Sequence, residues 1–364
     1  MTQSDMAVAG PAPHGLLGRL VAESAVTRGR LDLLTSQTAS GSVARTYSGL
    51  GSGARTVLDL RPTMAAMEVW QTNITTAKSR ADIALAAMDR MTAIASDFYA
   101  RVNTLNGLSA TDVDTTAMAA RDALREFASL LNTKNGDIFV FSGRDTGNAP
   151  VPNGDAILSS GFYTQISLAV SSLGISGAAV TSASTLAIAG SNSAGTSPFS
   201  AFLSQPASSL LMQRSLVYMG EQYSEEFGLL ASTNAAATSG GTSTTESYMR
   251  DILRALATLG SLSSTQIPDS GFAALIDDTR TSLRDSITAM TTDIGVFGAQ
   301  QARLQKYHEQ LGSVRLLVAF QVSRIEDVDM AATLASLSEV QNQLQASYQM
   351  ISSLRDLSLV KYLS

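Results

Sequence analysis

The sequence predicts a mainly α protein whose two chain ends form a long antiparallel, coiled-coil-like helical hairpin with a small β-containing insert. Three observations predict this fold class. Heptad patterns occur toward both ends of the chain, they stop in the middle, and the middle is rich in Gly, Ser, Ala and Thr. The chain has 364 residues, more than one core usually organises, so several structural units are expected.

Changes in periodicity divide the chain into four predicted segments. We expect a mobile tail over residues 1–15, where prolines and glycines gather, and an N-terminal helical segment over 16–143. Residues 144–241 are predicted to form an inserted β-containing outer domain. Residues 242–364 are predicted to be helical and to pack on 16–143.

The first helix is expected to begin at Leu16 and to end at Gly41. Its apolar residues keep a seven-residue register, which places them on one helical face. The residues of this stripe that we expect to serve packing and assembly are Leu17, Leu20, Leu31 and Leu34.

The longest heptad pattern follows, and Gly107 is its expected end. A repeat of this length, roughly 50 residues and about 75 Å, is typical of a coiled-coil seam. The apolar positions in register are Val57, Leu60, Met64, Met67, Ile74, Ala81, Leu85, Met88, Ala95 and Val102. Thr111–Leu131 has a further helical pattern, through Met118, Leu124, Phe127 and Leu131.

The middle of the chain changes to a strand-like pattern. Asp137–Phe141 is a short β-rich run bounded by glycines. Three further segments are strand candidates: Phe162–Val170, Leu186–Ala189 and Ser215–Met219. Helices are expected again over Glu246–Leu259, over Phe272–Thr292, and from Phe297 nearly to the end.

The closing segment, Ile325–Ser364, lacks proline and glycine and predicts an amphipathic helix of many turns. Glu326, Asp327 and Asp329 stand at its start, where negative charge complements the helix dipole. The residues of its apolar stripe that we expect to serve packing and assembly are Met330, Leu334, Leu337, Leu344, Tyr348, Ile351 and Leu354. Such a stripe needs a partner helix, and the other chain end supplies one.

Composition argues against several classes of function. Cysteine is absent, and only His14 and His308 could serve as histidine bases, so we predict no catalytic site, no metal site and no cofactor. With a net charge of −6 and no basic block, nucleic-acid binding is not expected. No apolar run approaches the ~18 residues of a membrane span, and Leu316–Phe320 is interpreted as a short buried patch.

Particular residues resemble the bacterial flagellin family. Ile325–Ala331 (IEDVDMA) and Leu344–Tyr348 (LQASY) are similar to the C-terminal signature of flagellins and their relatives. Leu34–Gly41 resembles the end of the family's N-terminal helix, and Asn132–Gly143 resembles the turn that leads to its outer domains. The resemblance covers about 16–143 and 244–364 and is absent between them.

The resemblance implies a structural, self-assembling component of the bacterial flagellum and not an enzyme. It implies a homo-oligomer that contacts hook-associated proteins and flagellin in the extracellular flagellum. It also implies delivery by the flagellar export apparatus, with an export chaperone and without a cleavable signal peptide, which the N-terminal residues lack. The residue patterns alone leave a different class open: an intracellular coiled-coil scaffold.

Overall fold

The computed structural model describes residues 13–104 and 109–363, and for residues 13–17 and 354–363 it describes the backbone alone. Most of the predicted tail, the expected helix end at Gly107, and the side chains of Leu17 and Leu354 therefore lie outside the described residues. The chain divides into two compact units. The first consists of 1–66 with 313–364, and the second consists of 67–312.

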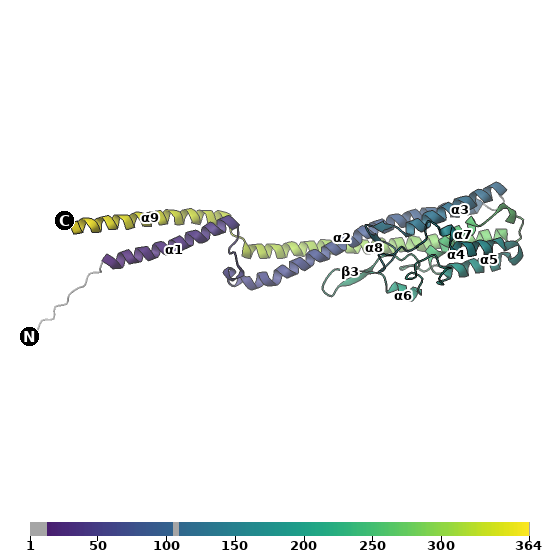
Figure 1. Cartoon of the computed structure of the whole chain (residues 1–364), viewed down its shortest axis with the longest axis horizontal. Helices are drawn as coiled ribbons and strands as arrows, with labels where there is room; N and C mark the ends of the chain where they lie inside the picture. The colour runs from purple at the N-terminus through teal and green to yellow at the C-terminus, as the bar shows by residue number, and fades with distance from the viewer. Residues whose placement is uncertain (1–12, 105–108, 364) are drawn as a thin grey trace, which may run out of the picture. The chain divides into compact units, whose positions relative to one another are not determined.

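Two antiparallel helices from the chain ends build most of the first unit. Helix α1 (Pro13–Ser40) lies beside α9 (Met330–Leu363) (Figure 1). Proline suits the first turn of a helix because its missing N–H would have no partner there. Helix α1 thus begins three residues before the predicted start, and Gly41, with φ 71°, ends it as expected.

The connectors that lead to these two helices pair with each other. The Val43 N–H donates to the Glu326 carbonyl at 2.7 Å, and the Val328 N–H donates to the Gly41 carbonyl at 3.0 Å. Ser42 and Asp327 form an isolated antiparallel bridge between them. A short 3₁₀ helix, η1 (Tyr47–Leu50), then leads from the first connector to α2.

The prediction that the closing helix is continuous from Ile325 is wrong at its start. Helix α8 ends at Glu326, and α9 begins at Met330. Asp329 caps the new helix, since its carboxylate accepts from the N–H groups of Ala331 at 2.9 Å and Ala332 at 3.1 Å. Of the three acidic residues that we assigned to this helix start, Asp329 has that role. Glu326 instead ends α8 and accepts a bidentate pair from Arg61 at 2.6 and 3.0 Å.

Helices α2 (Gly53–Thr104) and α8 (Phe272–Glu326) run antiparallel. In the second unit, Gln71 Nε2 donates to the His308 carbonyl at 3.5 Å, and the Thr92 hydroxyl donates to Met290 Sδ at 3.0 Å. Every predicted heptad position of α2 is buried or half-buried. The fold class predicted from these patterns, a helical hairpin with a small β-containing insert, is confirmed.

Helix α8 is continuous, so the prediction of two separate stretches, to Thr292 and from Phe297, is wrong. Gly295 and Gly298 lie inside the helix. Each glycine lowers helix propensity by about 1 kcal/mol, but packing of neighbouring side chains outweighs that cost. Met290 and Phe297 are both buried and hold this part of α8 against its neighbours.

Helix α7 (Tyr248–Gly260) is buried along its entire length and packs against α3, α4 and α5. Helix α3 (Ala110–Leu131) begins with a capping box formed by Ser109 and Asp112. It buries Leu124, Phe127 and Leu131, as the sequence predicted. Met118 is 55% exposed, because the apolar face of α3 runs through Val113, Ala117 and Ala120 instead.

Two of the strand candidates are wrong. Phe162–Val170 lies in α4 (Gly161–Ser171), and Leu186–Ala189 lies in α5 (Leu173–Gly190). The buried residues of α4 are Phe162, Ile166 and Val170, whose spacing of four is helical, and Ser160 caps the helix by accepting from the Tyr163 N–H. These runs are short and mostly apolar, so the helical spacing could not be recognised from the sequence.

The β-strands of the described residues form two antiparallel hairpins. β1 (Lys134–Asn135) pairs with β2 (Ile138–Phe139) within the predicted β-rich region, and Gly136 turns between them with φ 62°. β3 (Ser215–Tyr218) pairs with β4 (Ser224–Phe227), so the third strand candidate is confirmed. Shorter elements connect these parts: η2 (Ile157–Ser159), α6 (Ala207–Leu211) and η3 (Ser264–Gln266).

Helix α5 is, within the described part of the chain, the one helix long and apolar enough to cross a membrane. The prediction that no run approaches this length is therefore wrong, since Ala and Ile raise the hydropathy of a segment that also carries Ser and Thr. Gly177 interrupts the helix with φ 76°. Beyond it, Thr181, Thr185 and Ala189 are buried in the second unit, where α5 packs against α7.

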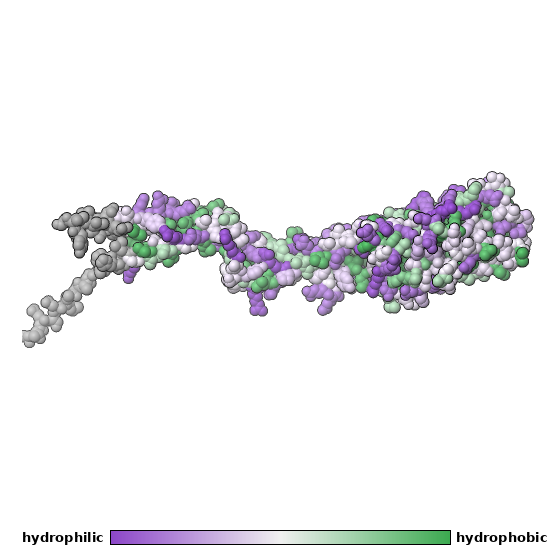
Figure 2. All heavy atoms as spheres, in the orientation of Figure 1, coloured by the Kyte–Doolittle hydropathy of each residue, from purple (hydrophilic) through white to green (hydrophobic). Residues whose placement is uncertain are grey.

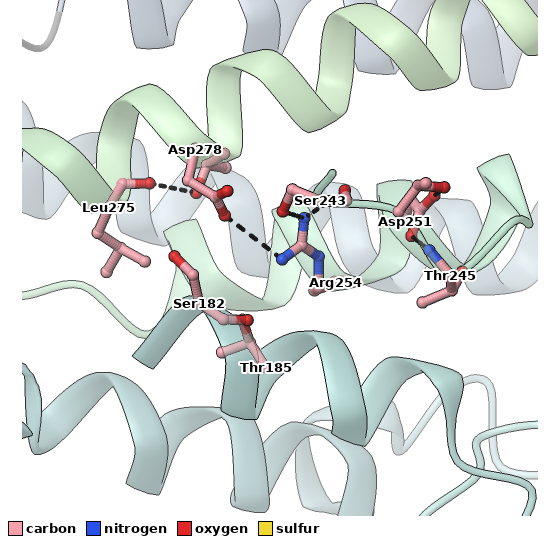
Figure 3. Close-up of polar contacts among 10 residues, drawn as sticks. Ser182, Thr185, Ser243, Thr245, Asp251, Arg254, Leu275 and Asp278 are labelled. Atoms are coloured by element: carbon pink, nitrogen blue, oxygen red, sulfur yellow. Dashed lines mark hydrogen bonds and ion pairs between the residues drawn. The ribbon is translucent and has the colours of Figure 1, made fainter. Parts of the chain in front are cut away.

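Charged side chains are buried around α7 (Figure 3). Arg254 donates to the Ser243 carbonyl at 3.1 Å and to its hydroxyl at 2.8 Å, and it lies 3.4 Å from an Asp278 oxygen. Asp251 accepts from the Thr245 N–H at 2.8 Å. Burial raises the pKa of the Asp251 carboxyl above its ordinary value of 3.8, although bonds from Thr244 and Thr245 oppose the shift.

This shift predicts a pH-dependent effect of Asp251→Asn. Because the folded protein holds the Asp251 proton more tightly than the unfolded chain, the native carboxyl favours folding most below its unfolded pKa, and this contribution is lost as pH rises through the folded pKa. The free energy of unfolding of Asp251→Asn, relative to the native protein, should therefore increase from acidic to neutral pH. Urea titrations across that range measure it, and a difference that does not vary with pH would contradict it.

Candidate assembly surface

The seam between α1 and α9 is made of small and apolar side chains. On α9, Thr333, Val340 and Leu344 are buried, while Leu337, Ser347 and Ile351 are half-buried. On α1 the facing stripe contains only half-buried residues: Leu20, Ser24, Thr27, Leu31 and Leu34. None of the described α1 side chains is fully buried.

Arg28 of α1 also contacts α9. Its guanidinium lies 5.9 Å from the centroid of the Tyr348 ring and donates a hydrogen bond to the Tyr348 hydroxyl. This contact lies at the margin of the seam, because Arg28 and Tyr348 are both exposed. A closed hydrophobic core is therefore absent from the described residues of this helix pair.

The predicted stripe of α9 divides between two surfaces. Leu337, Leu344 and Ile351 face the seam, and Leu344 is 9% exposed. Met330, Leu334 and Tyr348 are 41%, 46% and 42% exposed and lie outside it. In place of Leu334, Gln341 and Tyr348, the seam uses Thr333, Val340 and Ser347, each one position earlier in the sequence. The polar Gln341 therefore lies outside the seam and is exposed. We did not assign Thr333 and Ser347 to the seam from the sequence, because their polar hydroxyls do not fit an apolar heptad pattern.

Helix α1 shows the same division. Leu20, Leu31 and Leu34 face the seam, whereas Val21, Val26 and Leu33 are exposed. Figure 2 shows hydrophobic residues reaching the surface along both helices. We call the exposed apolar residues of the first unit the terminal apolar surface. Its members are Val21, Val26, Leu33, Tyr47, Leu58, Val314, Leu316, Leu317, Phe320, Met330, Leu334, Tyr348 and Met350.

Leu316–Phe320 contributes three strongly exposed residues to this surface, so its interpretation as a buried patch is wrong. Leu316, Leu317 and Phe320 are 73%, 70% and 65% exposed. They lie on α8 in the first unit, where few other elements cover the helix. Exposed apolar residues that gather on one surface mark an interaction site.

The described residues offer little for catalysis or metal binding. They contain no group of three or more His, Asp or Glu side chains arranged to hold a metal ion. His308 is half-buried on α8, and its Nε2 lies 3.4 Å from the Thr75 hydroxyl. His14 falls among the residues whose side chains are not described.

Comparison with known proteins gives a family match and solved structures of similar fold. Residues 281–363 match the family model of the bacterial flagellin C-terminal helical region. No curated protein matches this chain. A solved structure of a candidate flagellar hook-associated protein from Vibrio parahaemolyticus is similar at 12% sequence identity and a TM-score of 0.50, over 75% of this chain and 97% of that chain.

These findings define a class of protein: a helical fold whose C-terminal part matches the flagellin C-terminal helical region. The predicted resemblance to bacterial flagellins is confirmed for residues 281–363, which include all of α9 and most of α8. The fold is shared with the structure described as a hook-associated protein. At 12% identity that similarity concerns the fold and not the role.

Proposed function

We propose that this protein is a structural component of the bacterial flagellum that assembles through the terminal apolar surface. The observation that carries the proposal is the incomplete burial of the two terminal helices. Helix α1 has no fully buried side chain among those described, and the outer sides of α1, α8 and α9 carry exposed apolar residues. Neighbouring copies would cover this surface and supply the core that the helix pair lacks.

Within the flagellum, we place the protein at the junction of hook and filament. The ending Leu357–Leu363 (LSLVKYL) resembles the hook–filament junction protein, hook-associated protein 3, more than a filament flagellin. In that position it would contact other hook-associated proteins and flagellin. It would reach this position through the flagellar export apparatus, without a cleavable signal peptide. A chaperone would bind its exposed helices before export. A filament flagellin is the alternative, and labelled protein along isolated flagella would distinguish a single band at the hook from signal along the filament.

The scaffold alternative differs in location. An intracellular coiled-coil scaffold would stay in the cell whether or not the flagellar export apparatus is present. A secretion assay in strains with and without that apparatus separates the two classes. Secretion that depends on the apparatus supports the flagellar proposal, and retention in both strains contradicts it.

The domain division is also part of the proposal. We expect residues 144–241 to lie outside the assembly contacts, while 16–143 and 242–364 provide them. Ile175 of α5 gives a direct probe because it is 94% exposed. Ile175→Asp should be incorporated into flagella at the native level, and loss of incorporation with normal export would assign an assembly contact to the insert.

Assembly should protect the terminal helices from proteolysis. Arg28 and Arg30 are exposed on α1, and this helix has few contacts beyond α9, so we expect trypsin to cleave after them rapidly in the dilute monomer. Arg250 and Arg254 in the buried helix α7 serve as internal controls and should resist. Mass spectrometry of timed digests measures both. If α1 and α7 resisted trypsin equally in the monomer, the terminal helices would already be ordered before assembly, and the prediction would be wrong.

A further inference from the structure

The second unit contains a cavity of about 180 Å³ that the assembly proposal does not use. Its floor is α2, where Ala77, Ala81 and Ala84 leave space because their side chains are small. It is also lined by Ile138–Val140, which include β2, by Ser215–Tyr218, which is β3, and by Phe227–Leu229 and Phe297. The cavity is thus lined by parts of two β-hairpins that do not pair with each other.

The edge of β3 that faces away from β4 carries free hydrogen-bonding groups. The Tyr218 carbonyl accepts from Asn73 Nδ2 at 3.1 Å, so it points to α2 and not to β4. In an antiparallel ladder, the N–H and C=O of every second residue point to the same side. The Leu216 N–H and C=O and the Tyr218 N–H therefore also face away from β4, and within the described part of the chain neither N–H has a partner.

One charged residue, Arg80 of α2, lines the cavity. No hydrogen bond or ion pair joins its half-buried guanidinium to any residue that the structure describes. An arginine in a partly enclosed apolar site is best satisfied by a carboxylate, which accepts two parallel N–H bonds. The rest of the lining is apolar or neutral.

We propose that this cavity is a docking site for an extended, acidic segment of another polypeptide, which adds a strand to the free edge of β3. The unpaired backbone groups favour a polypeptide, because a strand supplies N–H and C=O groups at the matching spacing. Arg80 selects an Asp or Glu side chain, and the space above the alanines accepts an apolar side chain. All of these residues lie in 67–312, so the proposal does not depend on the flagellar assignment.

A groove-filling variant tests the site. Thr76 is exposed and lines the cavity, and its hydroxyl bonds only within its own helix, to the Thr72 carbonyl at 3.0 Å. Thr76→Trp should therefore fill the groove without disturbing the core. Thr72→Trp is the matched control, because Thr72 is exposed one turn earlier and does not line the cavity. Circular dichroism verifies that both variants keep the native helix content.

A library of displayed eight-residue peptides, selected on the full chain, provides the probe. We expect the selection to enrich peptides in which apolar residues alternate along the sequence and which contain an Asp or Glu. These peptides should still bind Thr72→Trp and should not bind Thr76→Trp. For the best peptide, fluorescence anisotropy should show Arg80→Ala weakening the affinity about tenfold or more, with no change for Arg55→Ala elsewhere on α2.

Any of the following results would overturn the proposal. Selection could enrich no peptides, or it could enrich peptides that lack acidic residues or still bind Thr76→Trp. Octanoate could also bind the native chain and not Thr76→Trp while no peptide is enriched, which would assign the cavity to small apolar carboxylates instead of a polypeptide strand.

Discussion

Leu344→Asp should abolish incorporation into flagella while leaving expression and export intact. Leu344 is one of the two buried apolar residues that the structure describes on α9 in its seam with α1, and it is 9% exposed. A carboxylate there would be desolvated without a partner, which costs several kcal/mol unless it protonates or the helices separate. Leu337→Asp, at a half-buried seam position, should act in the same direction. Immunoblots of purified flagella and of culture medium measure the incorporated and the unassembled protein.

Glu339→Lys is the matched control, since Glu339 is exposed on the same helix between these two seam residues. Exposed substitutions usually change stability by less than about 0.5 kcal/mol, so this variant should assemble. If the protein forms the junction, the Leu344→Asp strain should build hooks, secrete free flagellin and swim poorly. In a filament flagellin, the same change would impair filament growth and leave the junction intact. Normal flagella that contain Leu344→Asp at native levels would contradict the assembly role of α9.

Asp293→Ala should destabilise the second unit by about 3–5 kcal/mol in the free energy of unfolding. The Asp293 carboxylate is 1% exposed and accepts from the N–H groups of Ala235, Ala236 and Ala237 at 2.7, 2.8 and 2.6 Å. It also accepts from the Tyr248 hydroxyl at 2.9 Å. Alanine would leave these buried donors without an acceptor.

Deep burial, with a further contribution from the neighbouring Asp293 carboxylate, raises the pKa of the Tyr248 hydroxyl well above its ordinary value, so this group remains a donor throughout the neutral range. Urea denaturation followed by tyrosine fluorescence and circular dichroism measures the loss. Asp122→Ala is the control, because the Asp122 side chain is 76% exposed and pairs only with Arg125 on the same helix. A destabilisation by Asp293→Ala no larger than that of the control would show that the 235–237 backbone finds other acceptors.

The long-period parts of the fold could be predicted from the sequence, and the reason is visible in α2. Its heptad repeat continues over fourteen core positions from Val57 to Val102, all buried or half-buried, so a few polar interruptions do not obscure the period. The observed helix has 52 residues against an expected length of roughly 50. Helix α4 shows the opposite case. Its eleven residues contain too few polar positions to show a helical period of 3.6 residues. The sequence therefore could not distinguish a helix from a strand there.

The assembly surface could be predicted only in part. A heptad places residues on a face, but which half of the face is covered depends on the partner helix, and α1 covers Val340 and Leu344 while leaving Leu334 exposed.

The buried charges of the second unit could not be predicted at all. Arg250 bonds to the carbonyls of Ala189 and Ser191 at 3.0 and 3.3 Å, and Asp293 bonds to residues 235–237. Such contacts join segments tens of residues apart and leave no local pattern.

The paired connectors before α2 and α9 restrict which changes in chain length the terminal helices can accommodate. The bridge between Ser42 and Asp327 fixes the point from which both helices extend. An α-helix turns by about 100° with each residue, so one residue inserted between Asp329 and Thr333 would rotate the rest of α9 away from α1. Two full heptad units inserted into both helices would instead preserve the seam and extend it by about 21 Å. The terminal helices should thus vary in length by sevens, in matched pairs, and tolerate single insertions only beyond the last seam contact.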